Sequence, residues 1–176
     1  GMILDWGVHL IDQLLQIFSD EEIDTVYCEN THITNKEVDD GFKLTMRFKS
    51  GQRGYVEVGT YNFIALPRFY MQCESGTALI TDWREKAQVA KMTAWNEKDV
   101  LPVQTAAGIT KTMAPRDELT LDCYEIERPI SDVHDYYRNF VAALEGKEES
   151  FIKLSEVRRV MKVMEACFKS NELKQV

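Results

Sequence analysis

The strongest constraint on the fold is a strict alternation of apolar and polar residues between positions 42 and 49. Its apolar members are Phe42, Leu44, Met46 and Phe48. A period of two is typical of a β-strand that packs one face on a core and turns the other toward water or a partner. The turn residues at 50–53 include Gly51, so we expect residues 54–59 to return as an antiparallel partner.

The remaining patterns place helices at both ends of the chain and strands between them. We expect a helix from the start to about Phe18, and further strands over residues 24–33, 69–74, 77–81, 88–95, 110–112 and 122–127. One later helix carries the apolar stripe Val133, Tyr136, Tyr137, Phe140, Val141 and Leu144. The last helix is expected to face the core with Val157, Val160, Met161, Met164 and Phe168. This order predicts a single α+β domain over residues 1–176, with a largely antiparallel open sheet and helices packed on one face.

Polar side chains gather on one face of the opening helix. Asp5, His9 and Asp12 follow each other at steps of three or four residues, which places them on one side of a helix. A carboxylate next to an imidazole can orient the ring, and such a pair is suited to proton transfer near neutral pH. The structural alternative is that Asp5 is an ordinary N-cap and His9 a solvated surface residue.

The opening residues carry a resemblance to a known family. The spacing Gly-x-x-x-Asp-x-Gly-x-His-x-x-Asp, from Gly1 to Asp12, resembles the catalytic signature that opens the C-terminal domain of the Gfo/Idh/MocA oxidoreductases. The family's aspartate and histidine fall on Asp5 and His9, and Asp12 matches a third recurring position. Looser similarities at Gly51, Ser75–Gly76, Asp135–Phe140 and Val157–Met161 extend the resemblance over essentially the whole chain.

The resemblance implies the domain of a dehydrogenase that faces the substrate. It implies an intact protein in which an N-terminal Rossmann domain binds NAD or NADP, and a substrate that is a sugar, a polyol or a derivative. His9 is then the acid/base that takes the hydroxyl proton, and Asp5 orients His9 or binds a substrate hydroxyl. Asp12 either binds substrate or supports the helix. The resemblance also implies a homodimer or tetramer.

Two elements of that chemistry are missing from these residues. No Gly-x-G-x-x-Gly spacing occurs, and no Lys-Pro dipeptide matches the lysine segment of the family's nucleotide domain. We therefore expect that the Rossmann domain is absent, that the chain is part of a larger protein, and that alone it neither binds NAD(P) tightly nor turns over substrate.

The loop at 60–68 supplies further candidate residues for a substrate pocket. It contains aromatic and amide side chains, and we add Tyr61, Asn62 and Arg68 to the substrate-binding set. The alternative is a loop folded back on its own apolar side chains.

Charge and cysteine usage narrow the partners. The net charge of −8 argues against nucleic acid or an anionic membrane as a partner, and no apolar run is long enough to span a bilayer. The four cysteines form no C-x-x-C motif and the three histidines have no ligand spacing, so no metal site is expected. Free thiols are typical of a reducing cytoplasm.

Two other functions remain open at this point. The first alternative to an enzyme is a non-catalytic module that dimerises through its sheet. The second is a small-ligand binding domain of another family. Tyr55, Tyr70 and Val89 lie on strands whose outer faces are not wholly polar, so we expect self-association through the sheet face.

Overall fold

The computed structural model describes residues 1–94, 101–111 and 120–174 of the chain. These residues form two compact units, and each is described by itself. Unit 1 comprises Gly1–Phe63 and Asp132–Val176, and unit 2 comprises Ile64–Ser131. The strand pairings among these residues are all antiparallel. Among the described residues, no helix is long and apolar enough to cross a membrane.

Unit 1 contains all of the described helices and one sheet. Its helices are the π-helical turn η1 (Ile3–Gly7), α1 (Val8–Ile17), α2 (His134–Leu144) and α3 (Leu154–Leu173). Its strands are β1 (Ile23–Thr31), β2 (Gly41–Phe48) and β3 (Arg53–Gly59), which pair in the order β1-β2-β3.

The alternation in β2 is confirmed as the centre of this sheet. Leu44 lies opposite Cys28 on one side and Val56 on the other. Phe42, Leu44, Met46 and Phe48 are all at most 1% exposed, while the intervening Lys43 and Arg47 are exposed. The turn between β2 and β3 places Gly51 at a φ of 96°, a backbone conformation that favours glycine.

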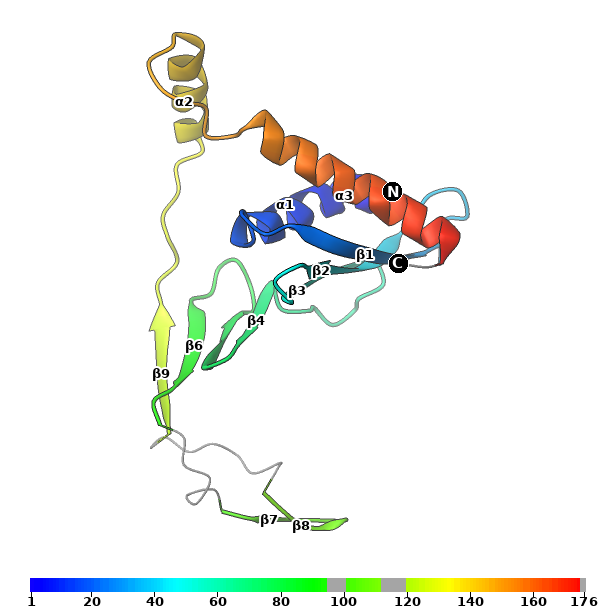
Figure 1. The fold of residues 1–176 in the computed structure, drawn as a ribbon, viewed down its shortest axis with the longest axis vertical. Coiled ribbons are helices and arrows are strands. Elements are labelled where there is room, and N and C mark those ends of the chain that lie inside the picture. Colours follow the sequence, from blue (N-terminus) through cyan, green and yellow to red (C-terminus); the bar gives the residue numbers. More distant parts are fainter. Residues whose placement is uncertain (95–100, 112–119, 175–176) are drawn as a thin grey trace. The chain divides into compact units, whose positions relative to one another are not determined.

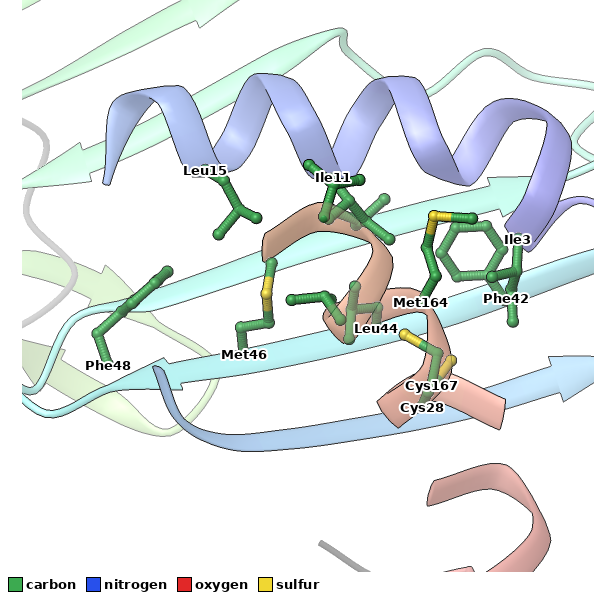
Figure 2. Close-up of a cluster of buried hydrophobic side chains, with 13 residues drawn as sticks. Ile3, Ile11, Leu15, Cys28, Phe42, Leu44, Met46, Phe48, Met164 and Cys167 are labelled. Carbon is green, nitrogen blue, oxygen red and sulfur yellow. The ribbon is translucent and has the colours of Figure 1, made fainter. Parts of the chain in front are cut away.

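Helices α1 and α3 cover the same face of the sheet (Figure 1). Ile11 and Leu15 of α1 meet Met164 and Cys167 of α3 above the apolar face of β2 (Figure 2). This arrangement of an antiparallel sheet with helices on one face confirms the predicted α+β class. Because residues from three separated parts of the sequence form one cluster, each of them depends on the others for its burial.

Side chains of α3 also complete the hydrogen bonding of the edge strand β1. The Cys28 amide donates to Ser170 Oγ at 3.0 Å, and the Asn30 amide donates to Asn171 Oδ1 at 2.8 Å. Near the start of α3, the Arg159 guanidinium donates to the carbonyl oxygens of Phe18 and Ser19, each at 2.9 Å. An edge strand otherwise presents unpaired backbone groups, so the two bonds to Cys28 and Asn30 cover part of this edge of the sheet.

The predicted core face of the last helix is partly wrong. Val160 and Met164 are buried as expected, but Val157, Met161 and Phe168 are exposed. Their places in the core are taken by Val163, Cys167 and Ser170. The helix has two overlapping apolar faces. The face that packs on β1 lies about 100° around the helix axis from part of the predicted face.

Helix α2 has the predicted apolar stripe, but this stripe is exposed. Val133, Tyr136, Tyr137, Phe140, Val141 and Leu144 are each at least 45% exposed. The only buried residue of the helix is Asn139, whose side-chain oxygen accepts the Phe151 amide at 2.8 Å. A polar side chain therefore anchors the link between α2 and α3.

Unit 2 is a second antiparallel sheet with a separate hairpin. Its strands β4 (Phe69–Cys73), β5 (Gly76–Ile80), β6 (Ala87–Met92) and β9 (Leu121–Ile126) pair in the order β4-β5-β6-β9, so β9 is an edge strand. The hairpin pairs β7 (Val103–Thr105) with β8 (Gly108–Thr110). The strand predicted at 88–95 ends at Met92. Trp95 and Thr112, which closed two predicted strands, lie outside the described residues.

We predict that truncating the centre of the unit 1 core is far more costly than truncating the opposite face of the same sheet. Leu44→Ala removes a side chain that is 1% exposed and should lower the free energy of unfolding by about 2–5 kcal/mol. The matched control Lys43→Ala, at an exposed side chain on the opposite face of the same strand, should change it by less than about 1 kcal/mol. Urea denaturation followed by far-ultraviolet circular dichroism measures both. Equal effects of the two variants would contradict this core.

Candidate functional site

The candidate catalytic residues begin on a π-helical turn. The Gly7 amide donates to the Met2 carbonyl oxygen at 2.8 Å, a bond from residue i to i−5 that defines the π-turn, and α1 continues from Val8. Single π-turns are frequent at functional sites. A Cβ atom at Gly7 would lie 3.1 Å from the Phe42 ring, so glycine allows the close approach of this turn to the core.

Asp5 and His9 are both exposed on this segment. Asp5 caps neither helical element, because the N-cap residues are Met2 and Gly7 and neither element has a side-chain cap. The interpretation of Asp5 as an ordinary N-cap therefore fails. Among the described residues, neither the Asp5 carboxylate nor the His9 ring has a hydrogen-bonding partner, so both groups are accessible to a ligand.

Asp5 lines an open cavity of about 640 Å³ in unit 1. The cavity lies between η1, the connection from β1 to β2, and the residues that follow β3. It is lined by Gly1, Met2, Asp5, Thr34, Asn35, Val38, Asp39, Asp40, Thr60 and Tyr61. Three of these side chains are carboxylates and four carry a hydroxyl or amide group. A cavity of this size with several polar groups has the dimensions of a small-molecule site.

Asp40 is one fixed point of the cavity wall. Its Oδ2 accepts the Thr34 amide at 2.6 Å and the Thr34 hydroxyl at 3.1 Å, and its Oδ1 accepts the Thr31 hydroxyl at 3.0 Å. These bonds, the Thr34 amide above all, lower the pKa of the Asp40 carboxyl to about 2. The carboxylate therefore holds the connection between β1 and β2 in place as a charged acceptor.

The predicted site residues are only partly brought together. Asp5 and Tyr61 line the same cavity, whereas His9 is not among its lining residues. Asp12 accepts the Gln16 amide at 2.7 Å on the side of α1. Asn62 folds back over β3, since a Cβ atom at Gly59 would lie 2.8 Å from Asn62 Oδ1.

Arg68 belongs to unit 2. Its guanidinium lies over the Trp83 ring, 5.1 Å from the ring centre, as a cation–π pair. Its membership of the substrate-binding set stays a prediction.

Sequence reasoning missed the acidic and amide residues of the cavity wall. The sequence patterns give Asn35, Asp39 and Asp40 no role in the site, although all three line the cavity. A signal existed, because two adjacent acidic residues directly before a buried strand are unusual unless their carboxylates have partners. Among the residues that the structure describes, no cluster of His, Cys, Asp and Glu could hold a metal ion.

Comparisons with known proteins agree with this architecture. The sequence model for the GFO/IDH/MocA C-terminal domain matches residues 1–79. An NAD-binding protein from Listeria innocua is 38% identical, with a TM-score of 0.89 over 99% of this chain and 50% of its own length. Among proteins with curated descriptions, none matches.

Two more distant structures share the fold. A proposed oxidoreductase from Yersinia pestis is 16% identical, with a TM-score of 0.74 over 100% of this chain and 49% of its own. UDP-N-acetylglucosamine 3-dehydrogenase from Acidithiobacillus ferrooxidans is 12% identical, with a TM-score of 0.67 over 94% of this chain and 47% of its own. The chain thus spans about half the length of the solved structures that it matches.

The lowered pKa of Asp40 predicts a specific dependence of stability on pH. The folded-state pKa lies below the ordinary value of 3.8, so the contribution of Asp40 to stability is fully present above pH 3.8 and is lost as the pH falls toward about 2. Asp40→Asn should lower the urea midpoint at neutral pH, and the gap between variant and wild type should shrink as the pH falls through this range. Urea denaturation as a function of pH measures the gap. The exposed carboxylate of Asp20 gives the control, Asp20→Asn, and a gap that stays constant down to about pH 2 would contradict the assignment.

Proposed function

The chain is a C-terminal domain of the GFO/IDH/MocA family, and on that premise we propose that it is the substrate-facing half of an NAD(P)-dependent oxidoreductase acting on a sugar, a polyol or a derivative. The observation that carries the proposal is the accessible pair Asp5 and His9, one helical turn apart, with Asp5 lining a cavity of about 640 Å³. The similarity to a UDP-N-acetylglucosamine 3-dehydrogenase supports a sugar-like substrate.

The two side chains have separate roles in this proposal. Oxidation of an alcohol needs a base at the hydroxyl oxygen, and the His9 imidazole accepts that proton and returns it in the reverse direction. The Asp5 carboxylate accepts a hydrogen bond from a substrate hydroxyl in the cavity or orients the His9 ring. Tyr61, on the same cavity wall, adds a hydroxyl and an aromatic edge that can pack against a sugar ring. We also propose substrate contacts in the whole protein for Asp12, Asn62 and Arg68.

The residues that the structure describes do not fit a dinucleotide. The sequence has no Gly-x-Gly-x-x-Gly spacing, and the strand pairings of the described residues are all antiparallel, whereas a dinucleotide cradle needs a parallel strand–helix–strand unit. In the whole protein, NAD or NADP supplies the hydride acceptor, and we propose that the residues that bind it lie in a preceding Rossmann domain. The 176 residues then act as one substrate-binding and oligomerisation domain that is inactive alone.

We also propose self-association into a homodimer or tetramer through the sheet face, in the cytoplasm. Tyr55 is 68% exposed on the side of unit 1 away from the helices, and Tyr70 of unit 2 is 57% exposed. Exposed aromatic side chains on a sheet are typical of interfaces. The four cysteines are free thiols, which agrees with a reducing compartment.

A second candidate function is a dimerisation module without catalysis. In such a module the cavity could still bind a small ligand. The observation that favours it is that His9 lies outside the set of residues lining the cavity of Asp5.

We predict that His9→Asn in the full-length protein lowers kcat by about 10²–10⁴-fold, the usual contribution of a positioned acid/base. The measurement is NAD(P)H formation on the best substrate in a panel of sugars and polyols. His134→Asn is the matched control, since His134 is an exposed histidine at the start of α2. Unchanged turnover by the His9 variant would remove the catalytic assignment and favour the dimerisation module.

We predict that this chain alone shows no saturable binding of NADH or NADPH at low-micromolar concentration, because its sequence has no Gly-x-Gly-x-x-Gly spacing and its described strands pair only in the antiparallel sense. Isothermal titration calorimetry on the 176-residue chain measures this, and the full-length protein is the positive control. A low-micromolar dissociation constant for the chain alone would refute the division of labour proposed here.

A further inference from the structure

We propose that Asp39 is the positioning residue that holds the turn from which Asp5 enters the cavity. The proposal rests on the function proposed above, in which Asp5 contacts the substrate. Asp39 does not touch the substrate in this scheme, because its carboxylate is engaged with the backbone of the turn.

Asp39 accepts hydrogen bonds from the backbone amides of Met2 and Ile3, at the start of the turn. Its Oδ2 accepts the Ile3 amide at 2.8 Å, and its backbone carbonyl oxygen accepts the Met2 amide at 3.1 Å. The first amides of a helical segment have no acceptor within the helix, and η1 has no side-chain cap of its own. A residue 36 positions away in the sequence therefore supplies the missing acceptors.

The turn passes this constraint on to Asp5. The amides of Leu4 and Asp5 both donate to the Gly1 carbonyl oxygen at 3.1 Å. The backbone of Asp5 is thus fixed to Gly1, and the backbone of Met2 and Ile3 is fixed to Asp39. Ile3 adds an apolar anchor, since its side chain is fully buried in the core below. Among the described residues, the Asp5 side chain has no hydrogen-bonding partner of its own, so its direction depends on the backbone of this turn.

The position of the Asp39 side chain also limits the space for a side chain at position 1. A Cβ atom at Gly1 would lie 1.8 Å from Asp39 Oδ1 and 2.3 Å from its Cγ. The Asp39 side chain is 6% exposed and bonded to Ile3, so it cannot swing aside without losing that bond. A side chain at position 1 would therefore have to displace the Asp39 carboxylate, so the glycine of the opening motif and Asp39 together shape the turn.

Asp39 is itself held by its neighbour along the chain. Asp40 is bonded to Thr31 and Thr34, which fixes the end of the connection between β1 and β2 directly before the central strand. The wall of the cavity and the turn that carries Asp5 are consequently joined at one point. Movement of Asp39 would displace Asp5 relative to Tyr61 across the cavity.

The test uses backbone amide NMR of the 176-residue chain. In wild type, we expect Leu4, Asp5 and Trp6 to have order parameters near about 0.85, typical of rigid backbone. In Asp39→Ala these values should fall toward about 0.6, and hydrogen exchange of the Ile3 amide should accelerate by at least about tenfold. Asp39→Asn keeps one acceptor oxygen and should restore most of the order. Asp20→Ala, in the exposed turn after α1, is the control.

A double-mutant cycle separates a positioning role from a general loss of stability. Gly1→Ala should loosen the same three amides as Asp39→Ala, but it should have little further effect in the Asp39→Ala background, where the carboxylate that it strikes is gone. The amides of Leu44 and Met46 in β2 should keep wild-type exchange in every variant.

Three results would overturn the inference. They are an unchanged turn in Asp39→Ala, an unchanged turn in Gly1→Ala, or a loss of protection that is equal in β2 and in the turn. If Asp39→Ala fails to fold, Gly1→Ala and Asp39→Asn still decide the question. If the full-length Asp5→Asn and His9→Asn enzymes retain turnover while Asp39→Ala loosens the turn, the proposed function fails and the role of Asp39 in holding the turn stands.

Discussion

Burial of the apolar face of β2 beneath α1 and α3 is the constraint on which the rest of unit 1 depends. Each strand residue that points inward needs a cover from a distant part of the chain, and Leu44 obtains it from Ile11 and Met164 (Figure 2). This contact brings the first and last parts of the chain together on the same strands. Because α1 is fixed on the sheet, the turn that precedes it is placed at one end of the sheet, where the cavity forms.

The cavity is built by polar bonds on top of this apolar base. Asp39 and Asp40 are both buried, and burial of a carboxylate is tolerated only when hydrogen-bond donors surround it. Here the donors are backbone amides and threonine hydroxyls of the segments that form the cavity wall. The same bonds leave Asp5 without a partner among the described residues, so the group proposed to meet the substrate is free to do so.

The exposed apolar stripe of α2 differs in kind from the buried stripe of α3. Both helices have helical periodicity. Helix α3 accepts hydrogen bonds from two β1 amides at Ser170 and Asn171, whereas the Asn139 side chain of α2 bonds to the segment that links α2 to α3. Periodicity shows that a helix has an apolar side, and it contains no information on what covers that side. The length of the relatives, about twice that of this chain, is consistent with a function shared with further residues.

The sequence by itself determined the antiparallel strands and the fold class, because these follow from local periodicity. It also predicts the pair Asp5 and His9 from a short motif. It did not determine which stripe of α3 is buried, since Val157 and Val160 both belong to acceptable apolar faces and only contact with β1 distinguishes them. Nor did it find Asp39, whose partner Ile3 is far away in the sequence. Hydrogen bonds and packing between distant residues exist only after the chain has folded, so the cavity and the residue that positions Asp5 were decided by the tertiary structure alone.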